Sequence, residues 1–247
     1  MRGIIDKALF WVSVPKCIGC GERLNYGDLS LCADCMRKYI AAKDRNCSRC
    51  AKQLCECGCS NAFLESHYVK RVAKVFRYFG HDNARVENRL VYSLKQDNRS
   101  DVAELLSYEL YDAVSSVIDT PSDCVFTNVP RRKAAIKEYG IDHAAVLAKR
   151  LAKRFGAKYE RILISKSKTP QKTKQGIVDR YRNVEFDYAR LPDLRGKRVI
   201  LVDDIITTGA SVGRAAMLLH GLGAKKIYAA AIAIAYKDEY MPFEIRE

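Results

Sequence analysis

Residues 198–211 hold the side chains of this chain that are best arranged for chemistry. An apolar run at 199–202 leads directly into two adjacent carboxylates, Asp203 and Asp204. The turn that follows is rich in small and hydroxyl-bearing residues: Thr207, Thr208, Gly209, Ala210 and Ser211. A continuous apolar run is typical of a strand that is covered on both faces. The segment therefore predicts a buried strand that ends in a polar loop.

This loop is expected to lie at the N-terminus of a helix over 212–222, which ends at Gly223. Free backbone N–H groups and the helix dipole favour an anion at such a place, and Gly209 lets the backbone approach it closely. Because carboxylates would repel a phosphate, Asp203 and Asp204 must face a different group. The vicinal hydroxyls of a ribose need hydrogen-bond acceptors and suit them. The pattern predicts a sugar-phosphate site.

The rest of the body supplies strands and helices that would position this loop. Apolar and β-branched runs predict one or two strands over 68–79 and further strands at 123–129, 161–165, 199–204 and 226–235. Helical spacing of apolar residues predicts helices over 84–96, 101–118, 142–155 and 212–222. This alternation favours an α/β fold, a mostly parallel twisted sheet with helices on both faces. Ligands of such sheets bind beyond the carboxyl ends of the strands, where the two carboxylates lie.

The front of the chain is rich in cysteine, with nine of the ten cysteines before residue 60. Two C-x-x-C pairs separated by eleven residues suit one tetrahedral zinc site of four thiolates: Cys17, Cys20, Cys32 and Cys35. Cys47 and Cys50 begin a second set, which two of Cys55, Cys57 and Cys59 would complete. One or two zinc ions are expected, and they would be structural because the protein fills every position. A redox role for these pairs is disfavoured, since no thioredoxin-like βαβ pattern surrounds them.

Composition and charge bound the remaining possibilities. The 247 residues predict a cysteine-rich zinc-binding module at 1–60 and a second domain at 61–247, with a leading segment at 4–14 that packs on the body. Of the net charge of +14, the region 131–182 carries +12, from sixteen basic and four acidic residues. Such a region attracts pyrophosphate or nucleic acid, or is simply solvated. The apolar stretch at 8–15 is too short for a membrane span or a signal peptide, so we expect a cytoplasmic protein without membrane insertion.

The motif at 198–211 resembles the 5-phosphoribosyl 1-pyrophosphate (PRPP) loop of type I phosphoribosyltransferases. The resemblance implies that Asp203 and Asp204 hold the ribose hydroxyls and that residues 207–211 hold the 5-phosphate. Mg would accompany the pyrophosphate and be held largely by the ligand's own oxygens. Hypoxanthine-type transferases place a catalytic Asp where this chain has Thr207, and a threonine cannot act as a base at neutral pH. Classical nucleobase salvage is therefore the less favoured activity, and the catalytic base is not identified.

Further segments resemble the ComF competence family: 129–144, 167–171, 180–184 and the pair Leu94-Lys95, together with the front cysteines. This resemblance implies a sheet of the type I phosphoribosyltransferase type behind a zinc module. It also implies a role in natural transformation, with single-stranded DNA and a DNA-uptake helicase or recombination protein as partners. Arg131 and Arg132 would meet pyrophosphate oxygens. The family pattern Arg-Gly-Phe-Asn-Gln stands here as residues 139–143, so Tyr139 replaces a cationic donor and Asp142 replaces an amide.

Two classes of function remain open. In the first, the protein is an enzyme that binds PRPP or a related ribose phosphate and transfers or hydrolyses the phosphoribosyl group. In the second, it binds nucleic acid or docks a partner protein without turnover, with bases stacked on Tyr139, Phe155, Tyr159 and Tyr181. The four histidines, His143 among them, are interpreted as capping, surface or packing residues.

Overall fold

The structure is a computed structural model that describes residues 15–28, 30–80, 82–166, 181 and 184–235. The leading segment at 4–14 and the family-like segment at 167–171 lie outside these residues, as does most of 180–184.

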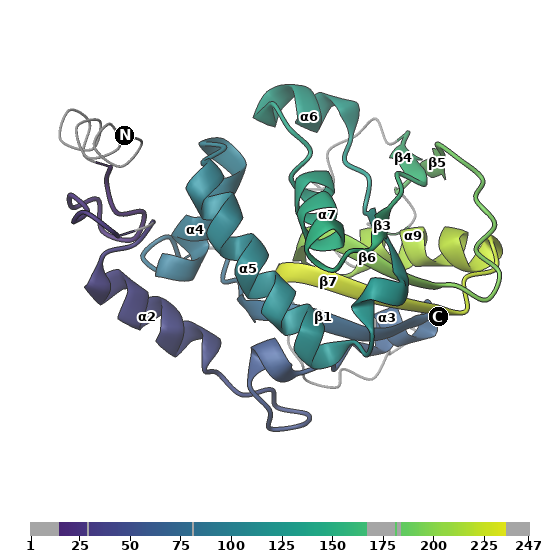
Figure 1. Cartoon of the computed structure of the whole chain (residues 1–247), viewed down its shortest axis with the longest axis horizontal. Helices are drawn as coiled ribbons and strands as arrows, with labels where there is room; N and C mark the ends of the chain where they lie inside the picture. Colours follow the sequence, from purple (N-terminus) through teal and green to yellow (C-terminus); the bar gives the residue numbers. More distant parts are fainter. Residues whose placement is uncertain (1–14, 29, 81, 167–180, 182–183, 236–247) are drawn as a thin grey trace, which may run out of the picture.

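Five parallel strands form the central sheet in the spatial order β1-β7-β6-β2-β3. Their bounds are β1 Val69–Arg77, β2 Cys124–Asn128, β3 Lys158–Tyr159, β6 Arg198–Ile206 and β7 Lys226–Ile234. The α/β fold class predicted from the alternation of strands and helices is confirmed. β6 lies at the centre of the sheet, between β7 and β2 (Figure 1), and it carries Asp203 and Asp204 in its last four residues.

Side chains of β6 alternate between the two faces of the sheet, as parallel strands with buried faces require. Ile200 and Val202 belong to one hydrophobic core, whereas Val199 and Leu201 belong to the other. The helices are α2 Ala33–Lys43, α3 Ala62–Ser66, α4 Val86–Gln96, α5 Ser100–Val117, α6 Lys133–Tyr139, α7 His143–Arg154 and α9 Ala210–Gly221. α5 and α7 cover the first face, and α3 and α9 cover the second (Figure 1). None of these helices is long and apolar enough to cross a membrane.

Several elements differ from the predictions: α3 and β3 were not predicted, and further differences lie near the cavity. The strand expected at 161–165 does not join the central sheet, because the chain leaves its edge after Glu160, whose N–H donates to the carbonyl of Phe126. β4 Leu163–Ser165 instead pairs antiparallel with β5 Phe186–Tyr188 in a small separate sheet. Helix α6 was not predicted, since Ala135 is its one buried residue and no apolar periodicity marks it.

The front segment shares its core with the sheet. Leu24, Leu31 and the fully buried Tyr39 belong to the same hydrophobic cluster as Phe76 of β1, and the rings of Tyr39 and Phe76 meet edge to face at 5.9 Å. Short 3₁₀ turns at Leu54–Glu56 and Pro121–Asp123 complete the described elements. The first half of the cysteine-rich segment is thus anchored on β1 and α4.

Candidate functional site

A cavity of about 800 Å³ opens at the carboxyl ends of β2 and β6. The residues predicted for a ribose phosphate all line it: Asp203, Asp204, Thr207, Thr208, Gly209, Ala210, Ser211, Arg131 and Arg132. α4 contributes Tyr92 and Lys95, and the small sheet contributes Ser165 and Phe186. The topology thus brings segments more than a hundred residues apart in the sequence to one cavity.

The polar loop after β6 leads directly into α9. Gly209 is the residue before the helix and has φ 88°, a left-handed conformation that favours glycine. A Cβ at this position would also lie 2.9 Å from the side chain of Leu64 in α3. Both observations explain why glycine stands here. The loop therefore presents backbone N–H groups at a helix N-terminus, which is a favourable place for a phosphate.

The two carboxylates at the end of β6 differ in their surroundings. Asp204 lies 2.9 Å from Arg131 Nη2 and 3.2 Å from Lys95 Nζ. Burial raises the pKa of Asp204, but the two cations outweigh this and bring the pKa down to about 2. Burial and the negative charge of Asp204 raise the pKa of Asp203 well above its ordinary value. Among the described residues no cation pairs with Asp203, so its carboxyl group is the one left for a ligand, although one of its oxygens also accepts from the N–H of Asp204.

Arg131 is the centre of a network that fixes its position. Its guanidinium donates to Asp204 and to Nδ1 of His143, at 2.7 Å, and lies 5.2 Å from the centre of the Tyr139 ring. Because an arginine can only donate, His143 accepts at Nδ1 and carries its proton on Nε2, which donates to Asn98 Oδ1. Burial and the charge of Arg131 lower the pKa of His143 to about 4. Neutral His143 is therefore a functional candidate that the sequence did not reveal.

The other predicted base-stacking residues lie in structural contacts. Phe155 stacks between Tyr111 and Phe126 in the core, and the hydroxyl of Tyr159 donates to Asn128 at 2.8 Å. The ring of Tyr181 packs on Phe63 and His67 of the α3 region. Of the four aromatic residues predicted to stack bases, Tyr139 is the one that lines the cavity.

The basic region is partly neutralised by the protein itself. Arg150 and Arg154 of α7 both donate to Glu104 of α5, and Lys158 pairs with Glu160 at 2.7 Å. These side chains therefore contribute less to the external field than the sequence suggests.

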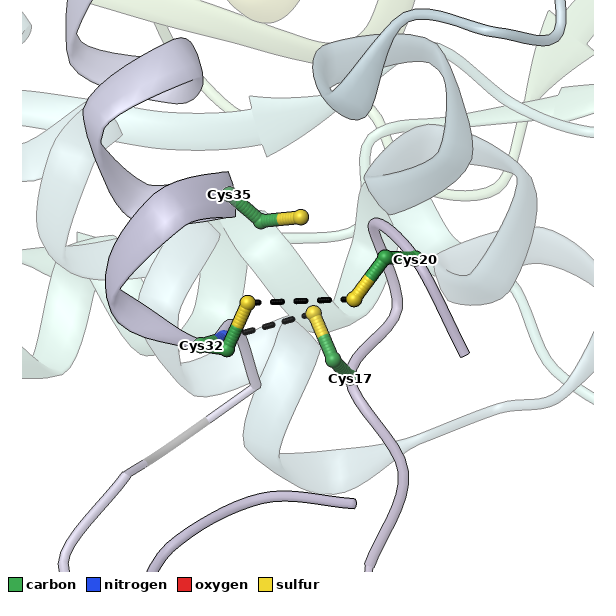
Figure 2. A group of neighbouring side chains, drawn as sticks. All are labelled: Cys17, Cys20, Cys32 and Cys35. Carbon is green, nitrogen blue, oxygen red and sulfur yellow. Dashed lines mark hydrogen bonds between the residues drawn. The ribbon is translucent and has the colours of Figure 1, made fainter. Parts of the chain in front are cut away.

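The first cysteine cluster has the geometry of a metal site. The sulfur atoms of Cys17, Cys20, Cys32 and Cys35 all lie within 4.8 Å of one another, as Figure 2 illustrates. Cys20 and Cys32 are 3.8 Å apart, and tetrahedral zinc holds its sulfurs about 3.8 Å apart because each Zn–S bond is about 2.3 Å. Backbone N–H groups of Gly19 and Cys32 donate to the sulfur of Cys17, which favours its thiolate form. The four thiols fit a zinc ion.

The second cluster shows which two of Cys55, Cys57 and Cys59 lie beside Cys47 and Cys50. Cys47, Cys50, Cys57 and Cys59 place their sulfurs within 4.8 Å of one another. Cys55 lies elsewhere: it packs against the main hydrophobic core, and its thiol is 3.9 Å from Gln53 Oε1. Cys57 and Cys59 are therefore the pair that the sequence left open. This cluster also could hold a metal such as zinc.

Comparison with known families identifies one domain. Residues 141–243 match the model of the phosphoribosyl transferase domain. This match includes the loop at 203–211, α7 and the last strands of the sheet, but not the cysteine clusters. The chain thus contains a domain of the phosphoribosyltransferase type behind a cysteine-rich segment.

Individual relatives match short parts of the chain. The ribose-phosphate pyrophosphokinase of Thermococcus kodakarensis is 62% identical over 39 residues, which are 16% of this chain and 14% of that enzyme. The corresponding enzyme of Sulfolobus acidocaldarius is 50% identical over 50 residues, 19% of this chain and 17% of its own length. The chain therefore matches less than a fifth of the length of these curated relatives.

Solved structures show weaker likeness. A purine phosphoribosyltransferase from Pyrococcus horikoshii is 20% identical with a TM-score of 0.36, and it covers 53% of this chain and 71% of its own. The phosphoribosylpyrophosphate synthetase of Mycobacterium smegmatis is 21% identical with a TM-score of 0.31, covering 53% and 33%. TM-scores this low support no inference about function.

Proposed function

We propose that this protein binds PRPP or a related ribose 5-phosphate in the cavity beyond β6 and β2. The observation that carries the proposal is the meeting in one cavity of a helix N-terminal loop at 207–211, two arginines and the carboxyl group of Asp203, which no cation pairs with in the described part of the chain. A phosphorylated ribose needs these three kinds of group: N–H donors for the phosphate, an acceptor for the hydroxyls and cations for a pyrophosphate.

The two acidic residues would have different roles. Asp203, which has no cation partner among the described residues, would accept hydrogen bonds from the ribose hydroxyls. Asp204 would act mainly by holding Arg131 and Lys95 at the cavity wall. Arg132, beside them, would meet the pyrophosphate. Mg bound to the pyrophosphate would neutralise the charge of the leaving group.

Turnover is proposed only in general form, as transfer or hydrolysis of a phosphoribosyl group. Thr207 stands where a catalytic base would be placed in hypoxanthine-type enzymes, so classical salvage is disfavoured. The resemblance to the ComF family favours a cytoplasmic protein that handles single-stranded DNA during transformation, behind a structural zinc module at 1–60. The chain departs from that family's pattern at 139–143: Tyr139 stands where the family has an arginine, and its ring packs on Arg131, so no pyrophosphate contact is proposed for position 139.

Thermal stabilisation by ligands tests the proposal. Mg-PRPP at millimolar concentration should raise the melting temperature of the wild-type protein. Ribose 5-phosphate and pyrophosphate should each give part of this shift, since they occupy different halves of the cavity. Asp203→Asn should reduce the shift with PRPP and ribose 5-phosphate and leave the shift with pyrophosphate.

A matched control is Asp112→Asn on the exposed face of α5, which should leave every shift unchanged. Absence of any stabilisation by the three ligands, in a protein that is folded and metal-loaded, would overturn the proposal. An equal loss with Asp112→Asn would show that the effect does not come from the cavity.

A second candidate is a binder of single-stranded nucleic acid that recognises a terminal phosphate without turnover. The observation in its favour is Tyr92, which lines the same cavity and is 62% exposed, so its ring is free to stack on a base. Binding of a 5-phosphorylated oligonucleotide should weaken steeply with salt and with Tyr92→Ala. Equal binding of an oligonucleotide without the phosphate would contradict this candidate.

A further inference from the structure

Lys74 is a buried cation in the middle of β1. Its side chain is fully buried, unlike that of Lys70 on the same strand, which is exposed. Among the described residues no carboxylate pairs with it. A buried ammonium without an anion is strongly unfavourable, so a compensating group is needed.

The partners of Lys74 all come from the second cysteine cluster or its own strand. Nζ donates to the carbonyls of Cys57 and Cys59, at 2.8 and 2.9 Å, and lies 3.3 Å from the sulfur of Cys57. The carbonyl of Val72, at 3.4 Å, is a weaker fourth contact. The contact with a sulfur gives Lys74 a partner that becomes an anion when a metal is bound.

The charges of the cluster need such a cation. Four thiolates and one divalent zinc ion carry a net charge of about −2, which a buried lysine reduces to about −1. Arg49 also lies near the cluster, but it pairs with Glu65 at 3.0 Å and is partly exposed. Lys74 is therefore the buried cation in direct contact with a ligand sulfur.

We propose that Lys74 is the outer-sphere counter-charge of the metal centre formed by Cys47, Cys50, Cys57 and Cys59, and that it links this centre to the phosphoribosyltransferase sheet. The positive charge of the lysine stabilises the thiolates that bind the metal. The metal centre in turn carries the negative charge that a buried lysine requires. In the described part of the chain no buried lysine contacts a sulfur of the first cluster: the nearby Arg99 is ion-paired with Asp101, and Arg89 donates to the carbonyl of Gly19.

This link extends toward the ligand cavity. Asn61 stands two residues after Cys59, and its side chain caps α3 by accepting from the N–H of Leu64. Leu64 lies where a Cβ on Gly209 would clash, so α3 packs directly on the phosphate loop. Lys74 anchors the segment at 57–59 from which α3 begins.

Competition for zinc by a chelator tests the proposal on the full-length holoprotein. Lys74→Met should weaken zinc binding at the second cluster by about 10–100-fold, the usual effect of losing an outer-sphere partner. Zinc at the first cluster should keep its affinity. Alkylation of the released thiols, followed by peptide mapping, identifies which cluster has lost its metal.

Two further variants keep the result interpretable. Lys70→Met makes the same chemical change at an exposed position near the start of β1 and should leave both zinc affinities unchanged. Lys74→Gln retains hydrogen-bond donors without the charge and should also weaken zinc binding at the second cluster. It provides the test if Lys74→Met fails to fold. Unchanged zinc affinity in Lys74→Gln, or equal weakening of both clusters, would overturn the proposal.

Discussion

The second cysteine cluster and the carboxylate of Asp204 both bury charge next to a lysine, but they balance it differently. At Asp204 the protein supplies both signs, with Lys95 from α4 and Arg131 from the loop after β2. At the cysteine cluster the protein supplies four potential thiolate anions and one cation, Lys74, and a metal ion must supply the remaining positive charge. The cavity can therefore form before its ligand arrives, whereas the cysteine cluster is incomplete until its metal binds.

The largest effect should come from breaking the second cluster. Cys57→Ser removes a metal ligand and leaves Lys74 buried without its sulfur partner, which should destabilise the protein by about 3–5 kcal/mol. Zinc content should fall from about two to about one per chain. Denaturant unfolding and metal analysis measure both.

Cys20→Ser is the comparison for this variant. It removes an exposed ligand of the first cluster and should also release one zinc. The loss of stability should be smaller, because no buried lysine contacts this cluster within the residues that the structure describes. Equal losses of stability in the two variants would contradict the distinction between the clusters.

The pH dependence of folding stability tests how the charged groups beside the cavity compensate one another. His143 has a folded pKa of about 4 against 6.5 for an ordinary histidine, owing to burial and Arg131. The unfolded chain therefore binds more protons between these values, so this contribution to stability is complete above pH 6.5 and is lost as pH falls toward 4. The loss should reach about 3 kcal/mol at most.

His143→Asn should flatten this dependence, since asparagine does not titrate. Asp204 faces the same network, but its low pKa places its own loss of stability nearer pH 2. Burial raises the pKa of Asp142 and of Asp203, so these two carboxyls act in the opposite direction and favour the folded state as the pH falls. An unchanged slope between pH 6.5 and 4 in His143→Asn would show that the histidine is not the group that titrates.

The sequence predicted the strand, the loop and the acidic pair because these signals are local. A run of apolar residues, two carboxylates and a glycine before a helix can be recognised within fourteen residues. The network around Arg131 could not be predicted in this way, because His143 and Asn98 come from separate elements and neither has a distinctive neighbourhood in the sequence. Lys74 was missed for the same reason: it stands in an apolar strand, and its partners are 15 and 17 residues away.

A smaller effect should follow from removing one member of the ion pair at the cavity. Arg131→Met should destabilise the protein by about 2 kcal/mol, because Lys95 remains to compensate Asp204. Asp204→Asn in the same chain should recover about 1 kcal/mol of this loss, since it removes the unpaired charge. A double-mutant cycle by denaturant unfolding measures the coupling, and strictly additive losses would contradict a direct pair.

The smallest effect should come from Cys55, the cysteine that the sequence could not separate from Cys57 and Cys59. Burial raises the pKa of its thiol, and the side chain packs against the main core, so it behaves as a neutral apolar residue. Cys55→Ala should leave the zinc content unchanged and cost about 1 kcal/mol or less. Cys59→Ala, four residues closer to α3 and part of the cluster, should release one zinc. If Cys55→Ala released zinc and Cys59→Ala did not, the second cluster would have a different ligand set, in which Cys57 would remain the ligand whose sulfur contacts Lys74.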